Sequence, residues 1–305
     1  MIGEAVRQEL SELLGEQIAF DAPMSRHTSL RIGGPADAFA TPTDREQLHG
    51  ILAICRNHGL RLTVVGAGFN CLVDDSGIDG VVVTLRKFRA LEEKSGPAVY
   101  AEAGVSHSAV TRFCVKQSLA GMEFAAGIPG TVGGWIMMNA GIGVREQKDV
   151  VLEVEIVTPG KPEAEILPRT ALDFRYRELR GLPQGAVVVS ALFSVDPSSS
   201  SAVKAEVDRL LARRSETQPL DVPSCGSVFR NPKDDFAGRL IEASGLSGHR
   251  VGGAEISRVH ANFIVNLGGA TAADVLALID CAREGVQSEH GVELETEVHV
   301  MGRSE

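Results

Sequence analysis

A glycine-rich stretch between residues 127 and 143 constrains this chain more than any other feature. It reads GIPGTVGGWIMMNAGIG and holds six glycines in 17 residues. Glycine adopts backbone conformations with φ > 0 and, because it lacks Cβ, lets the backbone come into contact with a ligand. Successive N–H groups in such a loop form a concave site for anions, and Pro129 restricts the same loop. The stretch predicts a loop that holds the diphosphate of a large dinucleotide; the alternative is a glycine-rich turn without a ligand.

Composition shows that the glycine excess is local. The chain has 305 residues, which is enough for about two domains. It contains 33 glycines, about 11% of its residues, against a usual ~7%. The excess lies in a few loops, so it indicates local backbone demands and not low complexity. The net charge of −10 opposes a general nucleic-acid binder, because such a protein needs a basic face.

The N-terminus and the cysteines indicate a cytoplasmic protein. Residues 1–16 are charged and amphipathic, without the apolar core of a secretory signal. No apolar run approaches the ~20 residues of a membrane span, so no membrane association is expected. The five cysteines are scattered and form no C-x-x-C pair, which predicts neither a zinc site nor a disulfide framework. We expect reduced thiols and no bound metal.

Helices and strands are expected in mixed order, which is typical of an α+β fold. Apolar periodicity predicts helices at 4–14, between Thr43 and Gly59, and at 106–121, 203–211, 235–244 and 271–289. It predicts strands at 60–65, 81–85, 99–103, 150–158, 186–195, 262–267 and 293–300, with a polar segment at 159–185. Thr43 and Glu46 form a predicted capping box. Pro197 and the serines that follow it mark the best domain boundary.

A second glycine loop, GAGFN at residues 66–70, follows the first predicted strand. A Rossmann fingerprint is excluded here, because the third glycine and the amphipathic helix that it requires are missing. On these residues alone, a flavin or nucleotide loop of another kind and a plain connection between strands both stay open.

Three other stretches carry residues suited to chemistry. They are DFRYRELR (173–180) with Tyr176 and Arg177, PSCGSVFRNP (223–232) with Ser227, and LETEVHVMG (294–302) with Glu297. Taken singly, each has a plain structural explanation: a salt-bridging arginine, a turn hydroxyl and the solvated face of an edge strand. Their co-occurrence is what points to a function.

Together and in order, these motifs resemble the UDP-N-acetylenolpyruvoylglucosamine reductases, flavoenzymes that make UDP-N-acetylmuramate for peptidoglycan. The resemblance extends along nearly the whole chain. It rests on HTSLRIGGPAD (27–37), VVGAGFNCLV (64–73), GIPGTVGGWIMMNAG (127–141), the Tyr176-Arg177 pair, GSVFRNP (226–232), AGRLIEASGL (237–246) with HANFIVN (260–266), and LETEVHVMG (294–302). Each motif is weak alone, whereas seven in register are specific. With only two tyrosines, the chain resembles the shorter class of these reductases, which lacks an inserted lid loop with a substrate-capping tyrosine.

The resemblance implies an architecture and a cofactor. Residues 1–197 are expected to form a two-part FAD-binding region of the sugar/alcohol-oxidase (PCMH-like) type, with its lobes divided near residues 85–90. Residues 198–305 are expected to form an α+β substrate-binding domain. FAD, held non-covalently, is expected to contact Gly66, Ala67, Gly68, Phe69, Asn70, Gly127, Ile128, Pro129, Gly130, Thr131, Gly133, Gly134 and Asn139. A monomer is expected.

The resemblance also implies the reaction and its residues. A hydride from NADPH is expected to pass through N5 of FAD to C3 of UDP-N-acetylglucosamine enolpyruvate. Ser227 matches the proton donor to C2, and Arg177 and Glu297 match the residues that stabilise the intermediate. The substrate pocket is expected to include Tyr176, Asn231 and Arg230, and the UDP diphosphate has Arg230, Lys233, Arg239 and Arg250 as candidate partners.

Two departures and two alternatives accompany this interpretation. Phe69 and Trp135 stand where the family usually has small residues, in loops expected to meet flavin. The alternatives are a sugar oxidase of the same scaffold that uses oxygen, and a nucleotide-sugar sensor without catalysis. Arg177, Ser227 and Glu297 disfavour both, because oxidation of an alcohol needs a base, not a proton donor to carbon, and a sensor needs none of the three.

Overall fold

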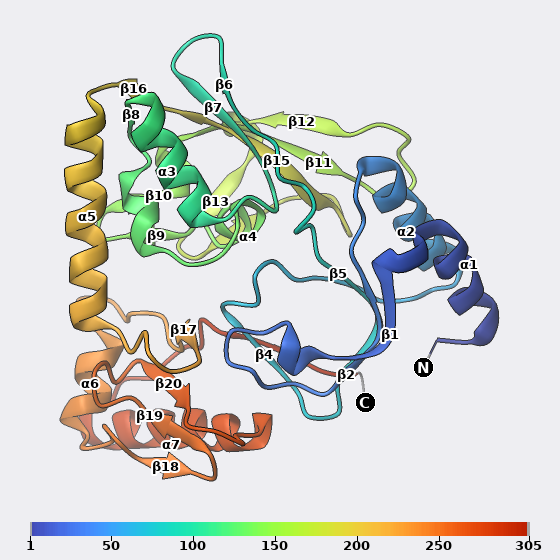
Figure 1. The fold of residues 1–305 in the computed structure, drawn as a ribbon. Coiled ribbons are helices and arrows are strands. Elements are labelled where there is room, and N and C mark those ends of the chain that lie inside the picture. Colours follow the sequence, from blue (N-terminus) through green and yellow to red (C-terminus); the bar gives the residue numbers. More distant parts are fainter. Residues whose placement is uncertain (1, 304–305) are drawn as a thin grey trace. The chain divides into compact units, whose positions relative to one another are not determined.

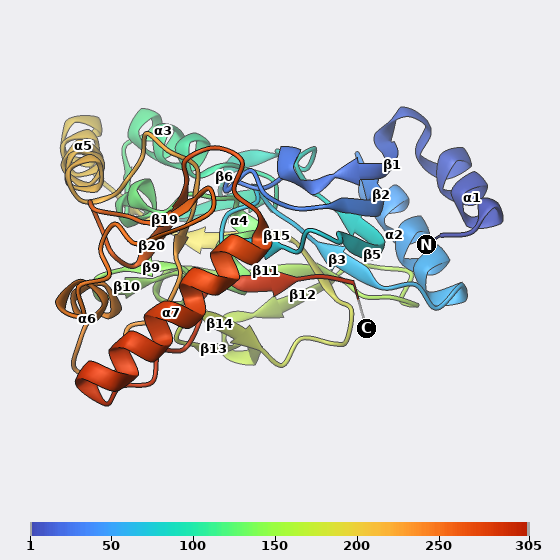
Figure 2. The same ribbon diagram turned by 90° about the horizontal axis from the view of Figure 1, so that it is seen from below.

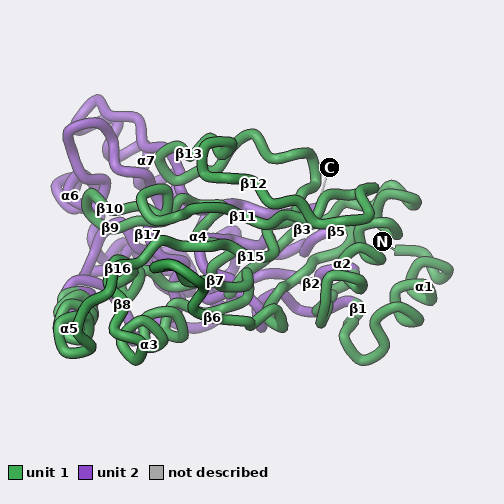
Figure 3. The backbone as a smooth tube through the Cα atoms, turned by 90° about the horizontal axis from the view of Figure 1, so that it is seen from above, with its two compact units in different colours: residues 1–20, 38–67, 80–213 green, residues 21–37, 68–79, 214–305 purple. Residues whose placement is uncertain are grey.

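The structure is a computed structural model that describes residues 2–303 and divides into two compact units (Figure 3). Unit 1 comprises residues 1–20, 38–67 and 80–213, and unit 2 comprises residues 21–37, 68–79 and 214–305. The chain passes from one unit to the other within β1 (Ile18–Pro23), β2 (Pro35–Ala40), β5 (Ile78–Val83) and α5 (Ser200–Thr217), and between Ala67 and Gly68. Two short segments from the first third of the chain therefore belong to the same unit as the last third.

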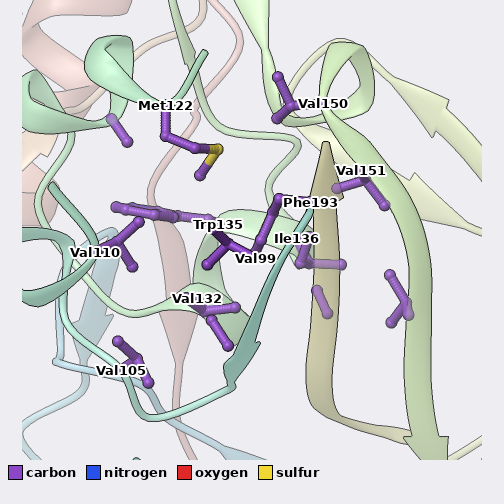
Figure 4. Packing of buried hydrophobic residues seen from close by; sticks show 14 of the residues in the cluster. Val99, Val105, Val110, Met122, Val132, Trp135, Ile136, Val150, Val151 and Phe193 are labelled. Carbon is purple, nitrogen blue, oxygen red and sulfur yellow. The ribbon is translucent and has the colours of Figure 1, made fainter. Parts of the chain in front are cut away.

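Unit 1 is built around a five-stranded antiparallel sheet of order β12-β11-β15-β7-β6 (Figure 1). Its strands are β6 (Leu91–Lys94), β7 (Ala98–Glu102), β11 (Val151–Val157), β12 (Glu165–Pro168) and β15 (Val187–Ser194). Helices α3 (His107–Gln117) and α4 (Val132–Met137) contribute to the same core, in which Trp135 and Phe193 are almost fully buried (Figure 4). The Ser106 side chain caps α3 by accepting a hydrogen bond from the Ala109 N–H, at the start of the helix predicted for residues 106–121.

A second core of unit 1 forms where α1 (Glu4–Leu14) packs against α2 (Arg45–Asn57) (Figure 2). Val6, Leu10 and Leu14 are buried, in agreement with the predicted helical stripe. The predicted Thr43–Glu46 capping box is wrong. Asp44 is the N-cap, and its carboxylate accepts a hydrogen bond from the Gln47 N–H at 2.9 Å.

The predicted buried strand at 60–65 is the shorter β3 (Leu62–Val64), which pairs in parallel with β5. Val64 is 43% exposed, so this strand is less buried than its apolar sequence suggests. Short pairs complete unit 1: β8 (Leu119–Ala120) with β16 (Asp196–Pro197), β9 (Gly141–Ile142) with β10 (Arg145–Glu146), and β13 (Asp173–Arg175) with β14 (Glu178–Arg180). The polar segment 159–185 thus holds three strands that its sequence did not predict.

Unit 2 is built around a four-stranded antiparallel sheet of order β17-β20-β19-β18. Its strands are β17 (Ser224–Ser227), β18 (Arg250–Val251), β19 (Ala254–Ile256) and β20 (Phe263–Asn266). Helix α7 (Ala272–His290) packs on β18 and β19, and α6 (Ala237–Ala243) packs on α7 (Figures 1 and 2). Thr271 begins α7 with a capping box shared with Asp274, and Asp75 accepts two further N–H groups of the first turn.

The C-terminal segment is a strand over only part of the predicted range 293–300. Strand β21 (His299–Met301) pairs in parallel with β4 (Cys71–Val73), and Thr296 forms a single bridge with Phe229. Alternation along this segment places Leu294, Val298 and Val300 on one face; Leu294 and Val298 are buried, but Val300 is 51% exposed. The strand is short because its partner β4 has only three residues.

Mixed helices and strands confirm the α+β class. Within residues 2–303, no helix has the length and hydropathy needed to cross a membrane.

Candidate functional site

The glycines of the stretch 127–143 lie in unit 1. Gly143 has φ +62° and lies in a turn, and the other five fall into two groups. In the first group, a side chain has no room. A Cβ atom on Gly127 would lie 2.4 Å from Ile142 Cδ1, one on Gly133 would lie 3.0 Å from Ala103 Cβ, and one on Gly141 would lie 2.3 Å from the Arg145 carbonyl oxygen. Ala103 and the Arg145 carbonyl oxygen exclude a side chain at Gly133 and Gly141, whereas the exclusion at Gly127 depends only on the tip of the exposed Ile142 side chain.

The second group, Gly130 and Gly134, faces open space, whereas Gly66 of the loop 66–70 lies directly against Thr131. A Cβ atom on Gly134 would have Thr131 Oγ1 as its nearest neighbour, at 3.9 Å. One on Gly130 would come no closer than 3.9 Å to the Trp135 ring, and one on Gly66 would meet only Thr131 Oγ1, at 2.8 Å. The backbone here forms an open cradle. This arrangement fits the diphosphate of a dinucleotide such as FAD, because glycine lets the ligand approach the main chain.

Trp135 lies in the core of unit 1, not on the surface of the cradle. It is 1% exposed and packs among Val110, Met122 and Phe193 (Figure 4). Its indole N–H donates a hydrogen bond to the Ile128 carbonyl at 3.3 Å. The Trp135 side chain therefore stabilises the loop that contains Ile128. Phe69, the other departure from the family pattern, lies in unit 2 and is 38% exposed.

Tyr176 and Arg177 form the two-residue turn of the β13–β14 hairpin, in which Arg175 pairs with Glu178. Arg177 has φ +59°, an uncommon backbone conformation for a residue with a side chain. Its guanidinium carbon lies 4.8 Å from the centroid of the Tyr176 ring. Glycine or asparagine suits such a turn better, and strained residues concentrate at functional sites. The position supports a functional role for Arg177.

Two groups of unit 1 hold the Arg177 side chain. Its Nη2 donates a hydrogen bond to the Gly141 carbonyl at 3.3 Å, and its Nη1 lies 4.0 Å from Glu146 Oε1. Glu146 also pairs with Lys148 Nζ at 2.5 Å. Glu146 is not among the residues that the sequence motifs indicate. The available signal was its spacing from Asp149, because the two residues cap the short helix η4 (Gln147–Asp149) reciprocally.

Asn139 lies beside this arginine and not on an open surface. Its side chain is completely buried, and its backbone has φ +39°. Its Nδ2 donates to Glu146 Oε2 at 3.0 Å and to the Arg175 carbonyl at 2.9 Å, while its Oδ1 accepts from the Lys148 N–H at 3.0 Å. These bonds engage both amide hydrogens and the amide oxygen.

Replacing the buried Gln147 should stabilise the protein. It is fully buried, and neither polar atom of its amide has a hydrogen-bond partner among residues 2–303. A buried polar group without a partner costs about 1–3 kcal/mol. Gln147→Met keeps the length and removes both groups, so it should raise the free energy of unfolding by about 1–3 kcal/mol in urea denaturation. The exposed Gln184→Met is the control and should change little. A loss of stability in Gln147→Met would show that the amide is satisfied in solution.

In unit 2, Ser227 follows an irregularity in strand β17. The strand pairs with β20 at Ser224↔Val265 and Ser227↔Phe263, and the register shifts between these pairs. Gly226 has φ +86°, which favours glycine. A bulge of this kind redirects the side chain next to it. Ser227 is half-buried, so its hydroxyl keeps access to a ligand.

Glu297 lies beside the Ser227 strand within unit 2. Its N–H donates to the Val228 carbonyl at 2.7 Å, and its carbonyl accepts from Asn70 Nδ2 at 3.1 Å. The Asn70 N–H donates to the Cys225 carbonyl at 3.0 Å. Asn70 therefore joins the segment that carries Ser227 to the segment that carries Glu297. Both belong to unit 2, whereas Arg177 belongs to unit 1.

Cys225, two residues before Ser227, is a structural thiol. It is 1% exposed, and burial raises the pKa of its thiol to about 12. Burial likewise raises the pKa of Cys71 to about 12. Because the thiolate is the nucleophilic form, neither cysteine is a nucleophile near neutral pH.

The structure distinguishes the basic residues predicted for a diphosphate. Arg239 and Arg250 form ion pairs with Asp235 and Glu255, respectively. Lys233 is exposed. Carboxylates therefore already neutralise two of the predicted cations.

Arg230 retains an unused donor. Its Nη1 lies 3.8 Å from Glu295 Oε2, but its buried Nε has no hydrogen-bond partner among residues 2–303. Asn231 is exposed, and its Oδ1 accepts from the Ala237 N–H at 3.1 Å at the start of α6.

Within residues 2–303, no cluster of three or more His, Cys, Asp or Glu side chains could hold a metal ion.

Comparisons with known proteins agree along the chain. Residues 36–161 match the family model of an FAD binding domain, and residues 218–301 match that of the C-terminal domain of UDP-N-acetylenolpyruvoylglucosamine reductase. The reductase of that name from Syntrophus aciditrophicus is 42% identical over 301 residues, which cover 97% of this chain and 96% of the relative. The one from Geobacter metallireducens is 44% identical over 292 residues and 96% of each chain. The crystal structure of UDP-N-acetylenolpyruvylglucosamine reductase from Thermus caldophilus matches with a TM-score of 0.80 and 33% identity, over 93% of this chain and 98% of that chain.

Proposed function

Because this chain belongs to the UDP-N-acetylenolpyruvoylglucosamine reductase family, we propose that it reduces UDP-N-acetylglucosamine enolpyruvate to UDP-N-acetylmuramate with NADPH as the electron source. It is an FAD-dependent oxidoreductase of peptidoglycan precursor synthesis. One observation carries the mechanistic proposal. In unit 2, Asn70 joins the strand of Ser227 to the segment of Glu297, two positions that match the catalytic pattern of the family.

The open cradle of unit 1 supports a site for FAD. We assign the FAD diphosphate to the main chain around Gly66, Gly130, Thr131 and Gly134, where Gly130 and Gly134 leave open space. We assign flavin binding to residues 1–197 and substrate binding to residues 198–305. When bound there, FAD would supply the hydride chemistry, with NADPH as the source of the hydride and C3 of the enol ether as its acceptor.

The proposed protein residues complete the reduction. Hydride addition at C3 leaves negative charge at C2, and this charge spreads to the substrate carboxylate. Arg177 offers a planar, bidentate cation suited to that carboxylate, and a fixed donor of this kind contributes about 10²–10³ in rate. Ser227 gives its hydroxyl proton to C2; as a weak acid, it donates only after the carbon has become strongly basic. Glu297 stabilises the intermediate as a protonated acid or through a hydrogen bond, since an ionised carboxylate would repel it.

Three residues are proposed to bind the nucleotide sugar. Tyr176 is 44% exposed beside Arg177, so its ring can contact substrate. Arg230 has a side chain that is 30% exposed, and its guanidinium suits a phosphate oxygen. Asn231 uses only its oxygen to start α6, and its amide N–H₂ has no partner assigned among residues 2–303. We propose that the protein acts as a monomer.

An anaerobic experiment tests this function. NADPH is added to the FAD-loaded protein without oxygen, and UDP-N-acetylglucosamine enolpyruvate follows. Bleaching of the visible flavin band and its rapid return on substrate would support the proposal. Bleaching without return would contradict the substrate, and turnover driven by oxygen without NADPH would favour a sugar oxidase. Failure to bind FAD would favour a nucleotide-sugar sensor.

Gly134→Ala tests the cradle itself. The added methyl group has no protein atom closer than 3.9 Å, and alanine is more favourable than glycine in a helix, so the protein without FAD should be at least as stable. The methyl group would occupy space assigned to FAD. We therefore expect FAD affinity, measured by quenching of flavin fluorescence, to fall about tenfold or more, equivalent to 1.4 kcal/mol.

Gly3→Ala is the control, because a Cβ atom there would have nothing within 4 Å and the residue lies before α1. It should leave FAD affinity unchanged. Normal FAD binding by Gly134→Ala would remove Gly134 from the proposed site.

A further inference from the structure

We propose that Asn139 is a positioning residue for Arg177 and that its side chain does not contact FAD. Resting on the proposed role of Arg177, this inference adds a residue that fixes where the guanidinium can lie. The flavoprotein pattern places Asn139 at the end of the FAD loop. The structure gives its amide other partners, all of them on segments that hold Arg177.

The hydrogen bonds of Asn139 use both of its amide donors within unit 1. Two acceptors, Glu146 Oε2 and the Arg175 carbonyl, face Nδ2 at 3.0 and 2.9 Å, and the Lys148 N–H faces Oδ1 at 3.0 Å. The chemistry of these partners fixes which end of the amide is which. Both amide hydrogens are used, and complete burial of the side chain closes the second lone pair of Oδ1 to a flavin atom.

Two of these bonds act on Arg177 from opposite ends. The Arg175 carbonyl lies at the start of the turn, so the bond to it fixes the backbone from which the Arg177 side chain leaves. The Glu146 carboxylate lies 4.0 Å from Arg177 Nη1, so the bond to it fixes a charge beside the guanidinium. Arg177 Nη2 also bonds to the Gly141 carbonyl, two residues after Asn139. One amide thereby anchors both the base and the tip of the arginine.

Asparagine suits this position for two reasons. Its backbone has φ +39°, and asparagine tolerates the left-handed region better than most residues. Its side chain combines two donors with one acceptor, which matches the three partners. Preorganisation matters because a long arginine otherwise samples many rotamers, and a small misplacement of a catalytic group costs about 10²-fold in rate.

Asn139→Asp is the matched variant. Aspartate is isosteric and keeps the acceptor for the Lys148 N–H, but it loses both donors and places a second carboxylate beside Glu146. We expect flavin reoxidation by the enolpyruvyl substrate to slow by about 10–10²-fold. FAD affinity and flavin reduction by NADPH should be unchanged. If aspartate prevents folding, Asn139→Gly keeps the backbone freedom, removes the amide and carries the same expectation.

A double-mutant cycle with Arg177→Lys separates positioning from a general structural role. If Asn139 acts through Arg177, Asn139→Asp should add little to the slowing already caused by Arg177→Lys. Val154→Ala is the stability control, because it creates a cavity in the core of unit 1. It should lower the melting temperature without changing the rate of either half-reaction.

Several outcomes would overturn the inference. Loss of FAD affinity in Asn139→Asp would make the residue a flavin contact, and equal slowing of both half-reactions or additive effects with Arg177→Lys would make it structural. Normal reoxidation in Asn139→Asp, with slow reoxidation in Arg177→Lys, would overturn only the positioning role. Normal reoxidation in Arg177→Lys would overturn the proposed role of Arg177 as well.

Discussion

Replacing Ser227 with alanine should slow flavin reoxidation by the enolpyruvyl substrate by about 10²–10⁴-fold, the usual contribution of a positioned proton donor. Flavin reduction by NADPH should stay nearly normal, because it needs no proton from Ser227. The substitution removes only a hydroxyl group, because Asn262 holds the segment that follows. Its carbonyl accepts from the Val228 N–H, its Oδ1 accepts from the Phe229 N–H, and its Nδ2 donates to the Phe229 carbonyl. Stopped-flow absorbance of the flavin, with the two half-reactions recorded separately, measures both rates.

Ser224→Ala is the matched control on the same strand. Ser224 has a similar exposure, and the bond it makes to Ser29 uses its main-chain oxygen, not its hydroxyl. In Ser224→Ala, the rates of flavin reduction and flavin reoxidation should both be normal. If Ser227→Ala slowed both half-reactions equally, Ser227 would be a structural residue, and the proton would have to come from another group.

Arg177→Lys should slow the same half-reaction by about 10²–10³-fold, as expected when a preorganised donor to a developing anion is lost. Lysine keeps the positive charge but is a point charge on a flexible stem, so it cannot replace a bidentate fork on a carboxylate. The bond to the Gly141 carbonyl and the contact with Glu146 would no longer fix the position of that charge. Single-turnover reoxidation of the reduced enzyme, followed at saturating substrate, measures the effect.

Arg175→Lys is the control for this prediction. Arg175 lies two residues away in the same hairpin, but it is well exposed and pairs with Asp173. Exposed ion pairs of this kind contribute at most about 1 kcal/mol, so stability and both half-reactions should be nearly unchanged. Near-normal reoxidation in Arg177→Lys would remove Arg177 from the mechanism.

Elements with local signals could be predicted from the sequence. Ser106 and Thr271 begin α3 and α7, and the apolar stripe of α1 is buried as expected. These features depend on residues three or four positions apart, so a short stretch of chain contains the whole signal. The motifs of the flavoprotein family add the class of reaction, because each motif keeps its spacing within one short segment.

Elements whose pairing partners are distant in the sequence were predicted less accurately. The segment 293–300 alternates like a strand, but strand pairing is limited to His299–Met301 because β4 offers only three residues. Within 159–185, the hairpin that carries Arg177 was overlooked because its strands are only three residues each, too short for a periodic pattern.

The same division applies to the proposed site. By itself, the sequence determined that glycines gather between residues 127 and 143 and that an arginine, a serine and a glutamate occupy the positions of a reductase, because residue identity is enough for both. Only the tertiary structure separated Gly134, which faces open space, from Gly127, which packs against Ile142. Only the tertiary structure showed that the amide of Asn139 donates a hydrogen bond to the hairpin that carries Arg177. The physical reason is that free space and hydrogen-bond capacity depend on neighbours that the fold brings together from distant parts of the chain.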